Sequence, residues 1–159
     1  MTRAGRDSAG FTLIELLTVC LLLGILLTFS LPAIRRYTTS ASLVGGTGQM
    51  SSAVRLARFK SVAAHANVIL RFQWTAGTYT IHTDANGNGV VESSEPMRGP
   101  FRVPRSITIA NALQSPVAGD SLVFRPDGTV LEGGAFRVIS PQTTKTLTVL
   151  RSTGEVYVQ

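Results

Sequence analysis

The pattern of hydrophobic and polar positions divides the chain into an apolar N-terminal stretch and a longer part of mixed character. Residues 11–34 are apolar apart from Glu15 and a few hydroxyl side chains, and the next charges along the chain are Arg35 and Arg36. A helix of roughly 20 apolar residues is long enough to cross a bilayer. The pattern therefore predicts a single membrane-spanning helix over residues 11–34.

A second helical pattern follows a cluster of glycines. Residues 35–48 are predicted to continue the first helix and then form a linker, because Gly45, Gly46 and Gly48 are expected to break the helix. Small and apolar side chains then recur at steps of three and four residues, which predicts a separate helix over residues 49–64. These side chains are Met50, Ala53, Val54, Ala57, Ser61 and Ala64.

The remainder of the chain is typical of β structure, because β-branched residues alternate with polar ones between clusters of turn-forming residues. Strands are predicted at residues 68–74, 78–83, 101–103, 106–110, 122–124, 135–139, 146–150 and 155–158. The expected fold class is α+β, in which a long N-terminal membrane-spanning helix precedes a small domain. That domain covers residues 49–159 and contains one further helix and antiparallel β-sheets.

The residues before the apolar run do not form an ordinary secretory signal. A secretory signal has its small-residue cleavage site after the apolar segment, whereas Gly10 lies before it. The stretch from Gly10 to Glu15 resembles the processing signal of type IV prepilins and type II secretion pseudopilins. The resemblance implies that residues 1–10 are a leader, that prepilin peptidase cuts after Gly10, and that the new N-terminus at Phe11 is N-methylated.

Glu15 is a candidate assembly residue because it places a carboxylate inside the predicted membrane helix. A charged side chain at the centre of such a helix costs about 2.5–3.5 kcal/mol on insertion scales. Cleavage creates a positive amine at Phe11, one helical turn away, and the two groups can pair within one subunit. The family resemblance favours pairing with the amine of the next subunit, and it assigns the bend of the helix to Pro32. The alternative is that Glu15 extends to the membrane interface.

Two later stretches resemble the GspH/FimT family of H-type pseudopilins and FimT-type minor pilins. One runs from Ala57 and Arg58 to the strand that begins at Val68, and the other comprises the turn at 124–128 and the hairpin at 152–154. The resemblance implies a pilin-like fold. It implies prepilin peptidase, other pseudopilins or pilins, the inner-membrane assembly platform and membrane lipid as partners. It places the N-terminus in the cytoplasm and the domain in the periplasm, anchored by one pass through the bacterial inner membrane.

Charge and cysteine content bear on the choice of partner. The formal net charge is +6 at pH 7, and no acidic residue lies between Glu15 and Asp84. Such a basic stretch is compatible with anionic head groups, with a solvated surface, or with DNA, whose phosphates dominate its affinity for proteins. DNA-binding FimT relatives carry a Gly-Arg-x-Arg stretch near the C-terminus, but residues 154–157 here lack both arginines, so DNA is the less favoured partner. Cys20 is the only cysteine, which excludes an intramolecular disulfide.

One loop satisfies the spacing of a calcium-binding loop. Oxygen donors stand at loop positions one, three, five, nine and twelve, position seven offers its backbone carbonyl, and Gly89 provides the sharp turn at position six. The predicted ligands are Asp84, Asn86, Asn88, Val90, Glu92 and Glu95. An EF-hand pair is excluded, because a strand leads in and prolines lead out. The alternative is an ordinary turn-rich connection, and no other cofactor is expected.

The sequence offers little support for an enzyme. His65 and His82 are lone histidines, and the chain lacks a nucleophile elbow and a phosphate-binding glycine loop. The resemblance leads to two functions. The favoured one is a minor pseudopilin, a structural subunit of the periplasmic pseudopilus of a type II secretion system. The alternative is a FimT-like minor pilin of a type IV pilus that acts in pilus assembly or DNA uptake.

Overall fold

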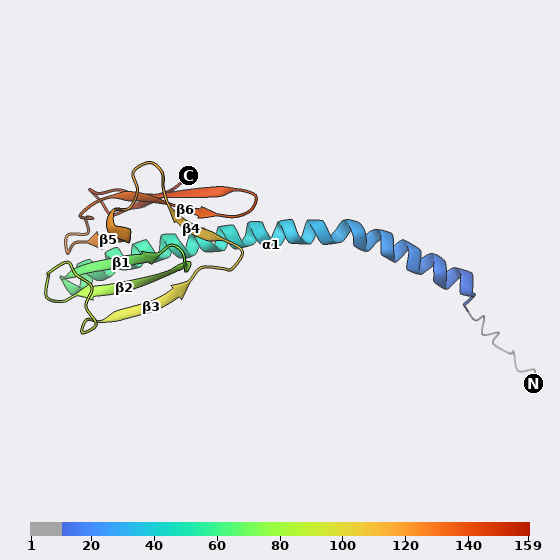
Figure 1. Ribbon diagram of the computed structural model, residues 1–159, viewed down its shortest axis with the longest axis horizontal. Helices are drawn as coiled ribbons and strands as arrows, with labels where there is room; N and C mark the ends of the chain where they lie inside the picture. Colours follow the sequence, from blue (N-terminus) through green and yellow to red (C-terminus); the bar gives the residue numbers. More distant parts are fainter. Residues whose placement is uncertain (1–10) are drawn as a thin grey trace, which may run out of the picture. The chain divides into compact units, whose positions relative to one another are not determined.

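A computed structural model of the chain describes residues 11–159, apart from the side chains at positions 29, 31–33, 35 and 36. The chain divides into two compact units, with the boundary between Thr38 and Thr39. The single α-helix of the described residues, α1 (Leu13–Ala64), contributes to both units. All the strands belong to the second unit, residues Thr39–Gln159 (Figure 1).

α1 continues through the glycine cluster, so the predicted break at Gly45, Gly46 and Gly48 is wrong. Residues 49–64 are helical as expected, but they form the C-terminal part of α1 and not a separate helix. The reason is packing, because a Cβ on Gly46 would lie 2.0 Å from Cδ1 of Ile107. Glycine at this position lets the helix backbone approach the domain closely. The tertiary contact therefore overrides the cost of glycine in a helix, which is about 1 kcal/mol.

One face of the later part of α1 is buried, as the spacing of its small and apolar residues predicted. The buried side chains are Leu43, Thr47, Met50, Ala53, Val54, Ala57 and Ser61. Ala64, which the pattern also placed on this face, is exposed. It is the last residue of α1, and His65 follows in a left-handed conformation with φ of 50°. The backbone N–H of Ala66 then donates to the carbonyl of Ser61, so the end of the helix is closed as in a Schellman motif.

Two antiparallel four-stranded sheets follow α1 in the described part of the chain. The first has the strand order β3-β2-β1-β5 and consists of β1 (Asn67–Gln73), β2 (Thr78–Asp84), β3 (Met97–Arg102) and β5 (Ser121–Phe124). The second has the order β4-β6-β7-β8 and consists of β4 (Thr108–Asn111), β6 (Gly134–Ile139), β7 (Thr144–Val149) and β8 (Val156–Val158). A short 3-10 helix, η1 (Ala118–Asp120), precedes β5.

Each predicted strand is present within a few residues of its expected bounds. The largest difference is at β3, which begins at Met97 and not at Phe101. Gly99 and Pro100 lie inside this strand and obscure its pattern in the sequence. Proline is tolerated there because β3 is an edge strand, where one side of the backbone needs no partner.

The core lies between the later part of α1 and the inner faces of the two sheets. Phe72 on β1 and Phe136 on β6 are both buried, and their ring centroids are 5.0 Å apart, so they join the two sheets. Trp74 stacks on Phe72 with centroids 4.5 Å apart, and its Nε1 donates a hydrogen bond to Asp120. The predicted α+β fold class is confirmed.

Within the residues that the structure describes, no helix is long and apolar enough to cross a membrane. The membrane-spanning role of residues 11–34 stays a prediction. Pro32 lies inside α1, and its role as the helix-bending residue also stays a prediction.

We expect Gly46→Leu to destabilise the domain, because the new side chain would enter the space that Ile107 occupies, and overpacking of this kind costs about 1–3 kcal/mol. Gly45→Leu is the matched control. Gly45 is exposed, and a Cβ there would meet no atom within 4 Å, so this change should be neutral or stabilising. Thermal melts of the full chain in detergent measure both effects. Equal melting temperatures for the two variants would contradict the close approach of α1 to Ile107.

Candidate functional site: an assembly helix and a domain groove

Thr12 caps the start of α1 and fixes the position of Glu15 on the helix. The Thr12 hydroxyl accepts a hydrogen bond from the backbone N–H of Glu15 at 3.3 Å, and the Thr12 carbonyl accepts one from Leu16 at 3.2 Å. This is the Thr-x-x-Glu spacing of a capping box, a signal that the sequence analysis did not use. Glu15 is therefore the third residue of the helix, where the helix dipole favours a negative charge.

The predicted processing residues lie at the very start of the described chain. Phe11 and Glu15 are both exposed, and no described residue forms a hydrogen bond or ion pair with the Glu15 carboxylate. Gly10 lies outside the described residues, so cleavage after Gly10 and methylation of Phe11 stay predictions. The structure thus places Phe11 and Thr12 directly before the first turn of α1, which contains Glu15, and no described side chain pairs with the Glu15 carboxylate.

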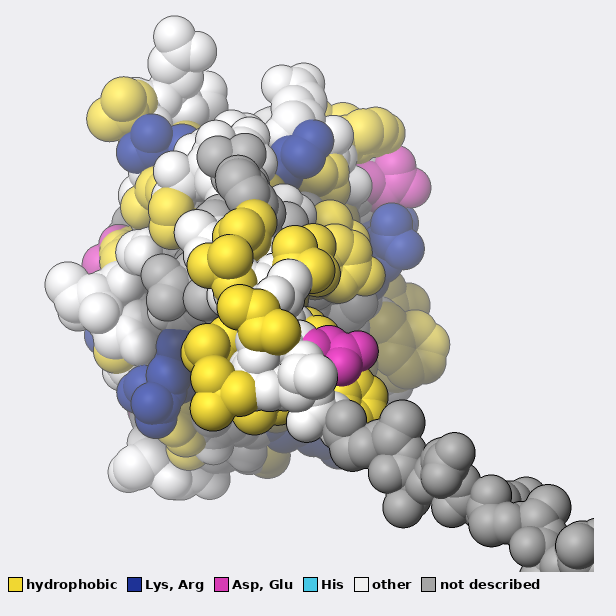
Figure 2. Space-filling view, turned by 90° about the vertical axis from the view of Figure 1, so that its right-hand side faces the viewer, with side chains coloured by type: hydrophobic (Ala, Val, Ile, Leu, Met, Phe, Trp, Pro, Cys, Tyr) yellow, Lys and Arg dark blue, Asp and Glu magenta, His cyan; other side chains and the backbone are white. Residues whose placement is uncertain are grey.

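The surface of α1 beyond Glu15 is apolar and uncovered. From Leu13 to Leu27 the large hydrophobic side chains are between 45% and 77% exposed, and yellow hydrophobic side chains gather on the face seen in Figure 2. The hydroxyl groups of Thr18, Thr28 and Ser30 each donate to the backbone carbonyl four residues earlier in the helix. Their polar groups are therefore satisfied inside the helix. An uncovered apolar surface of this extent marks contact with lipid or with another apolar surface.

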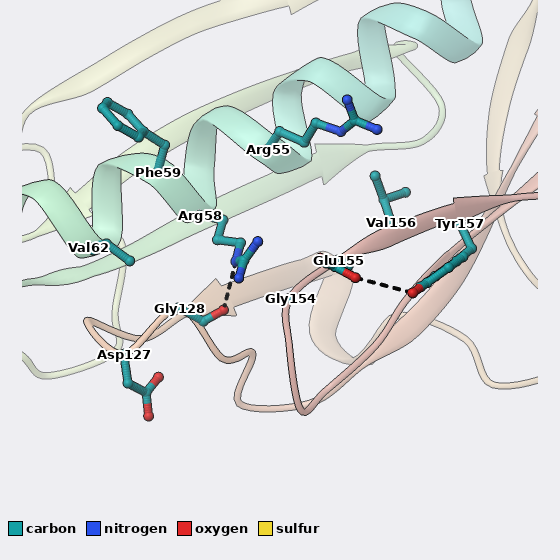
Figure 3. Close-up of a pocket in the computed structure, with 10 residues that line it drawn as sticks. All are labelled: Arg55, Arg58, Phe59, Val62, Asp127, Gly128, Gly154, Glu155, Val156 and Tyr157. Atoms are coloured by element: carbon teal, nitrogen blue, oxygen red, sulfur yellow. Dashed lines mark hydrogen bonds between the residues drawn. The ribbon is translucent and has the colours of Figure 1, made fainter.

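A second candidate site is a groove of about 550 Å³ in the domain, between the later part of α1 and β8, here called the α1–β8 groove (Figure 3). The groove is lined by residues from α1, from the turn before Thr129, and from β8 and the segment that leads into it. The lining residues are Arg55, Arg58, Phe59, Val62, Asp127, Gly128, Gly154, Glu155, Val156 and Tyr157. The sequence analysis noted both turns for their family resemblance but gave no signal that they meet on one side of the helix.

Two glycine turns and one arginine shape the floor of the α1–β8 groove. Nε of Arg58 donates to the carbonyl oxygen of Gly128 at 3.3 Å. Gly128 and Gly154 both have positive φ, at 81° and 64°, which favours glycine. A Cβ on Gly154 would lie 2.5 Å from the Gly128 carbonyl oxygen. The two turns therefore approach each other more closely than any other residue at position 154 would allow.

The carboxylates that line the groove already have partners. Asp127 accepts hydrogen bonds from the side chain and the backbone N–H of Thr129 at 2.6 and 2.8 Å, and these bonds lower the pKa of Asp127. Glu155 accepts a hydrogen bond from the Tyr157 hydroxyl at 3.1 Å, which raises the pKa of Tyr157. In the described part of the chain, Arg55 has no ion pair and Arg58 bonds only through Nε. The groove therefore offers unpaired cationic groups.

The predicted calcium loop is closed by hydrogen bonds among its own residues. Asp84 is buried, and its carboxylate accepts from the backbone N–H groups of Gly87, Asn88 and Gly89 at 2.7, 3.1 and 2.8 Å. The side-chain amides of Asn88 and Asn86 donate to Glu92 at 2.7 and 3.2 Å.

Glu95 is also buried, and it accepts from the backbone of Ala85 at 3.0 Å. The exposed Val90 donates its backbone N–H to the Asn88 side chain. Within the described residues, no group of three or more His, Cys, Asp or Glu side chains is arranged to hold a metal ion. The hydrogen bonds within the loop favour the alternative, an ordinary turn-rich connection, over the calcium-binding hypothesis.

His82, on the strand that leads into this loop, occupies a structural position. It is buried, and its Nε2 lies 2.9 Å from the Thr80 hydroxyl. Burial lowers the pKa of His82, the nearby Arg71 lowers it further, and Glu95 opposes these effects. The burial of His82 and its short distance to the Thr80 hydroxyl are consistent with a structural role.

Because hydrogen bonds already hold the loop closed, we expect thermal melts of the full chain in chelator and in millimolar calcium to coincide. If the ion did bind the folded loop, it would raise the melting temperature by mass action. Glu95→Gln, which removes the expected bidentate ligand, is the matched variant. A calcium-dependent rise in melting temperature that Glu95→Gln abolishes would establish the predicted ligand set instead.

Comparison with protein families identifies the chain. The family model described as Type II transport protein GspH matches residues 47–154, which is most of the second unit. The chain belongs to the GspH family. A second model, the prokaryotic N-terminal methylation motif, matches residues 5–31 and includes the predicted cleavage site. The resemblance to GspH/FimT-type pilins that the sequence indicated is confirmed.

Solved structures of a minor pilin and of a minor pseudopilin share the fold at low sequence identity. The type IV minor pilin FimU of Pseudomonas aeruginosa is similar with a TM-score of 0.57 and 14% identity, over 77% of this chain and 92% of FimU. The minor pseudopilin EpsH from the type 2 secretion system of Vibrio cholerae is similar with a TM-score of 0.52 and 9% identity, over 73% of this chain and 94% of EpsH. No curated protein sequence matches the chain. The family and both neighbours are pilin or pseudopilin subunits and not enzymes.

Proposed function

We propose that this GspH-family chain is a minor pseudopilin, a structural subunit of the periplasmic pseudopilus of a type II secretion system. The observation that carries the proposal is the uncovered apolar surface of α1, on which Glu15 lies inside the methylation motif and pairs with no described residue. Such a helix is suited to lie in lipid before assembly and to pack against equivalent helices in a fibre. Prepilin peptidase, other pseudopilins, the inner-membrane assembly platform and membrane lipid are the expected partners.

The chemistry of Glu15 gives the assembly step its specificity. An unpaired charge in an apolar medium is strongly disfavoured. Cleavage after Gly10 would give Phe11 a positive amine, which is also disfavoured there without a partner. Pairing Glu15 of one subunit with the Phe11 amine of its neighbour satisfies both groups, and it selects the axial register in which they meet. Thr12 supports this arrangement, because its hydroxyl bonds the backbone N–H of Glu15 and leaves the carboxylate free.

A minor pilin of a type IV pilus is the second candidate function, and the similarity to FimU favours it. DNA binding within this alternative is less supported. Glu155, in the place of an arginine of the DNA-binding motif, accepts a hydrogen bond from Tyr157. Arg137 is partly buried on β6, whereas Arg151 is exposed in the turn before β8.

Deletion of the gene in its own bacterium distinguishes the two machines. For a pseudopilin, we expect secreted enzymes to accumulate in the periplasm while surface pili and DNA uptake stay at the wild-type level, because the subunit serves only the secretion fibre. Immunoblots of periplasm and medium, with counts of pili and of transformants, measure these outcomes. Loss of pili or of transformation with normal secretion would assign the chain to the alternative.

Gly10→Val should block maturation, because the larger side chain stands directly before the bond that the peptidase cuts. The expected product is a full-length, unmethylated precursor in the membrane fraction, whereas the wild-type chain should begin with N-methylated Phe11. Mass spectrometry of the intact protein and of its N-terminal peptide distinguishes the two. A mature wild-type protein that begins at any other residue would contradict the prepilin assignment.

Glu15→Gln should impair entry into the fibre, because it removes the charge that pairs with the Phe11 amine in the proposal. The change keeps the size of the side chain and its place in the capped first turn. Disulfide crosslinking to partner pilins through introduced cysteines should fall by roughly tenfold, while the amount of membrane-bound, cleaved protein stays level. Thr18→Val is the matched control, since it changes a nearby exposed side chain of the same helix but keeps both the carboxylate and the Thr12 cap, and its crosslinking should stay at the wild-type level. Normal crosslinking of Glu15→Gln would mean that the charge only extends to the membrane interface.

A further inference from the structure

β8 has one unpaired edge. It is the last strand of its sheet and pairs only with β7. Gln159 and Thr146 exchange backbone hydrogen bonds in both directions, each at 2.9 Å. Bonded and non-bonded residues alternate along an antiparallel strand, so Tyr157 also directs its backbone groups toward β7. Val156 and Val158 therefore direct their N–H and C=O groups away from the sheet.

The unpaired edge of β8 borders the α1–β8 groove. The side chains of Val156 and Tyr157 point to opposite faces of the sheet, yet both residues line the groove, so the groove extends around the edge of the strand. α1 forms the opposite wall, where Phe59 is 69% exposed and Val62 is 45% exposed. An extended chain placed in the groove would meet backbone donors and acceptors on one side and apolar side chains on the other.

The charges at the groove favour an acidic occupant. Figure 3 shows Arg55 and Arg58 on the α1 side, and it shows the Asp127 carboxylate pointing away from both arginines. Thr129 engages Asp127, and Tyr157 engages Glu155. The guanidinium group of Arg55, on the α1 wall of the groove, therefore has no hydrogen-bond or ion-pair partner among the described residues. A guanidinium group binds carboxylates through paired N–H donors.

Other exposed strand edges are less suited to accept a strand. β3 forms the edge of the first sheet, but Pro100 lies in its middle and has no N–H to offer. β5 forms the opposite edge, and the backbone N–H of Leu131 already donates to the carbonyl of Val123 on that strand at 2.9 Å. β4 forms the other edge of the second sheet, and the side chain of its last residue, Asn111, bonds the carbonyl and the N–H of Val117 at 2.9 and 2.7 Å. The edge of β8 combines free backbone groups with an adjoining groove.

We propose that the α1–β8 groove binds an extended acidic segment of another protein chain, which adds to the edge of β8 as a further strand. The backbone of the segment pairs with Val156 and Val158, its apolar side chains cover Phe59 and Val62, and a carboxylate pairs with Arg55. The proposal goes beyond assembly through α1, because it gives the periplasmic domain a partner site of its own that does not depend on Glu15.

The test uses the full chain, labelled with ¹⁵N in detergent micelles, and a synthetic nine-residue peptide of alternating valine and threonine that carries two glutamates. At saturating peptide, the amide exchange of Val156 or Val158 should slow by about fivefold or more, because a new hydrogen bond protects the N–H. The amide of Tyr157, which already bonds to β7, should change little. A peptide with lysines in place of the glutamates should bind at least about tenfold more weakly.

Three variants locate the site. Val158→Pro removes one outward N–H without removing a bond to β7 and should weaken binding, provided its spectrum remains that of the folded domain. Arg55→Glu should weaken binding of the acidic peptide by roughly tenfold. Arg105→Glu makes the same charge change at an exposed arginine outside the groove and should leave binding unchanged. Three results would overturn the proposal: equal binding of the two peptides, protection at β3, β4 or β5 instead of β8, or equal effects of Arg55→Glu and Arg105→Glu.

Discussion

The carboxylate of Glu15 lies on an uncovered apolar helix surface, and no described side chain pairs with it. An arrangement of this kind is favourable only when the apolar surface is covered and the charge acquires a partner. The hydroxyl groups of Thr18, Thr28 and Ser30 are satisfied inside the helix, but no described residue pairs with the Glu15 carboxylate. Under the proposed function, lipid or neighbouring helices cover the apolar surface, and pairing of the carboxylate with a neighbouring amine selects the geometry in which two subunits meet.

The later part of α1 faces a different constraint, because two sheets must close around it. Small residues recur on its buried face at Gly46, Ala53, Ala57 and Ser61, and they let backbone and sheet approach each other closely. Gly46 shows the balance of effects most clearly. Its cost to the helix is about 1 kcal/mol, whereas any side chain there would have to displace Ile107. Tertiary packing therefore decides the length of α1 as well as its orientation toward the core.

The sequence predicted the strands well, because their signals are local: alternation along the strand and turn residues at its ends. The sequence-based prediction of a helix break at the glycine cluster was wrong, because the deciding contact comes from Ile107, about sixty residues further along the chain. The sequence predicted Phe11 and Glu15 from a contiguous motif, and it missed the Thr12 cap although the spacing was visible. The α1–β8 groove was not predictable, because its walls come from residues 55–62, 127–128 and 154–157, which only the fold brings together.

The shape of that groove is a consequence of how the domain folds and not of any occupant. Gly154 lies against the Gly128 carbonyl, and Arg58 bonds the same oxygen from the helix. The two turns and the helix wall are therefore held in place before anything binds. A preformed site spares the binding partner the entropic cost of ordering it, so even the short edge of β8 is able to contribute to affinity. Changes at Gly128 or Gly154 would consequently act on binding through the shape of the groove, and they would also act on the stability of the domain. Arg55, which forms no hydrogen bond or ion pair with a described residue, is the lining residue whose substitution separates these two effects.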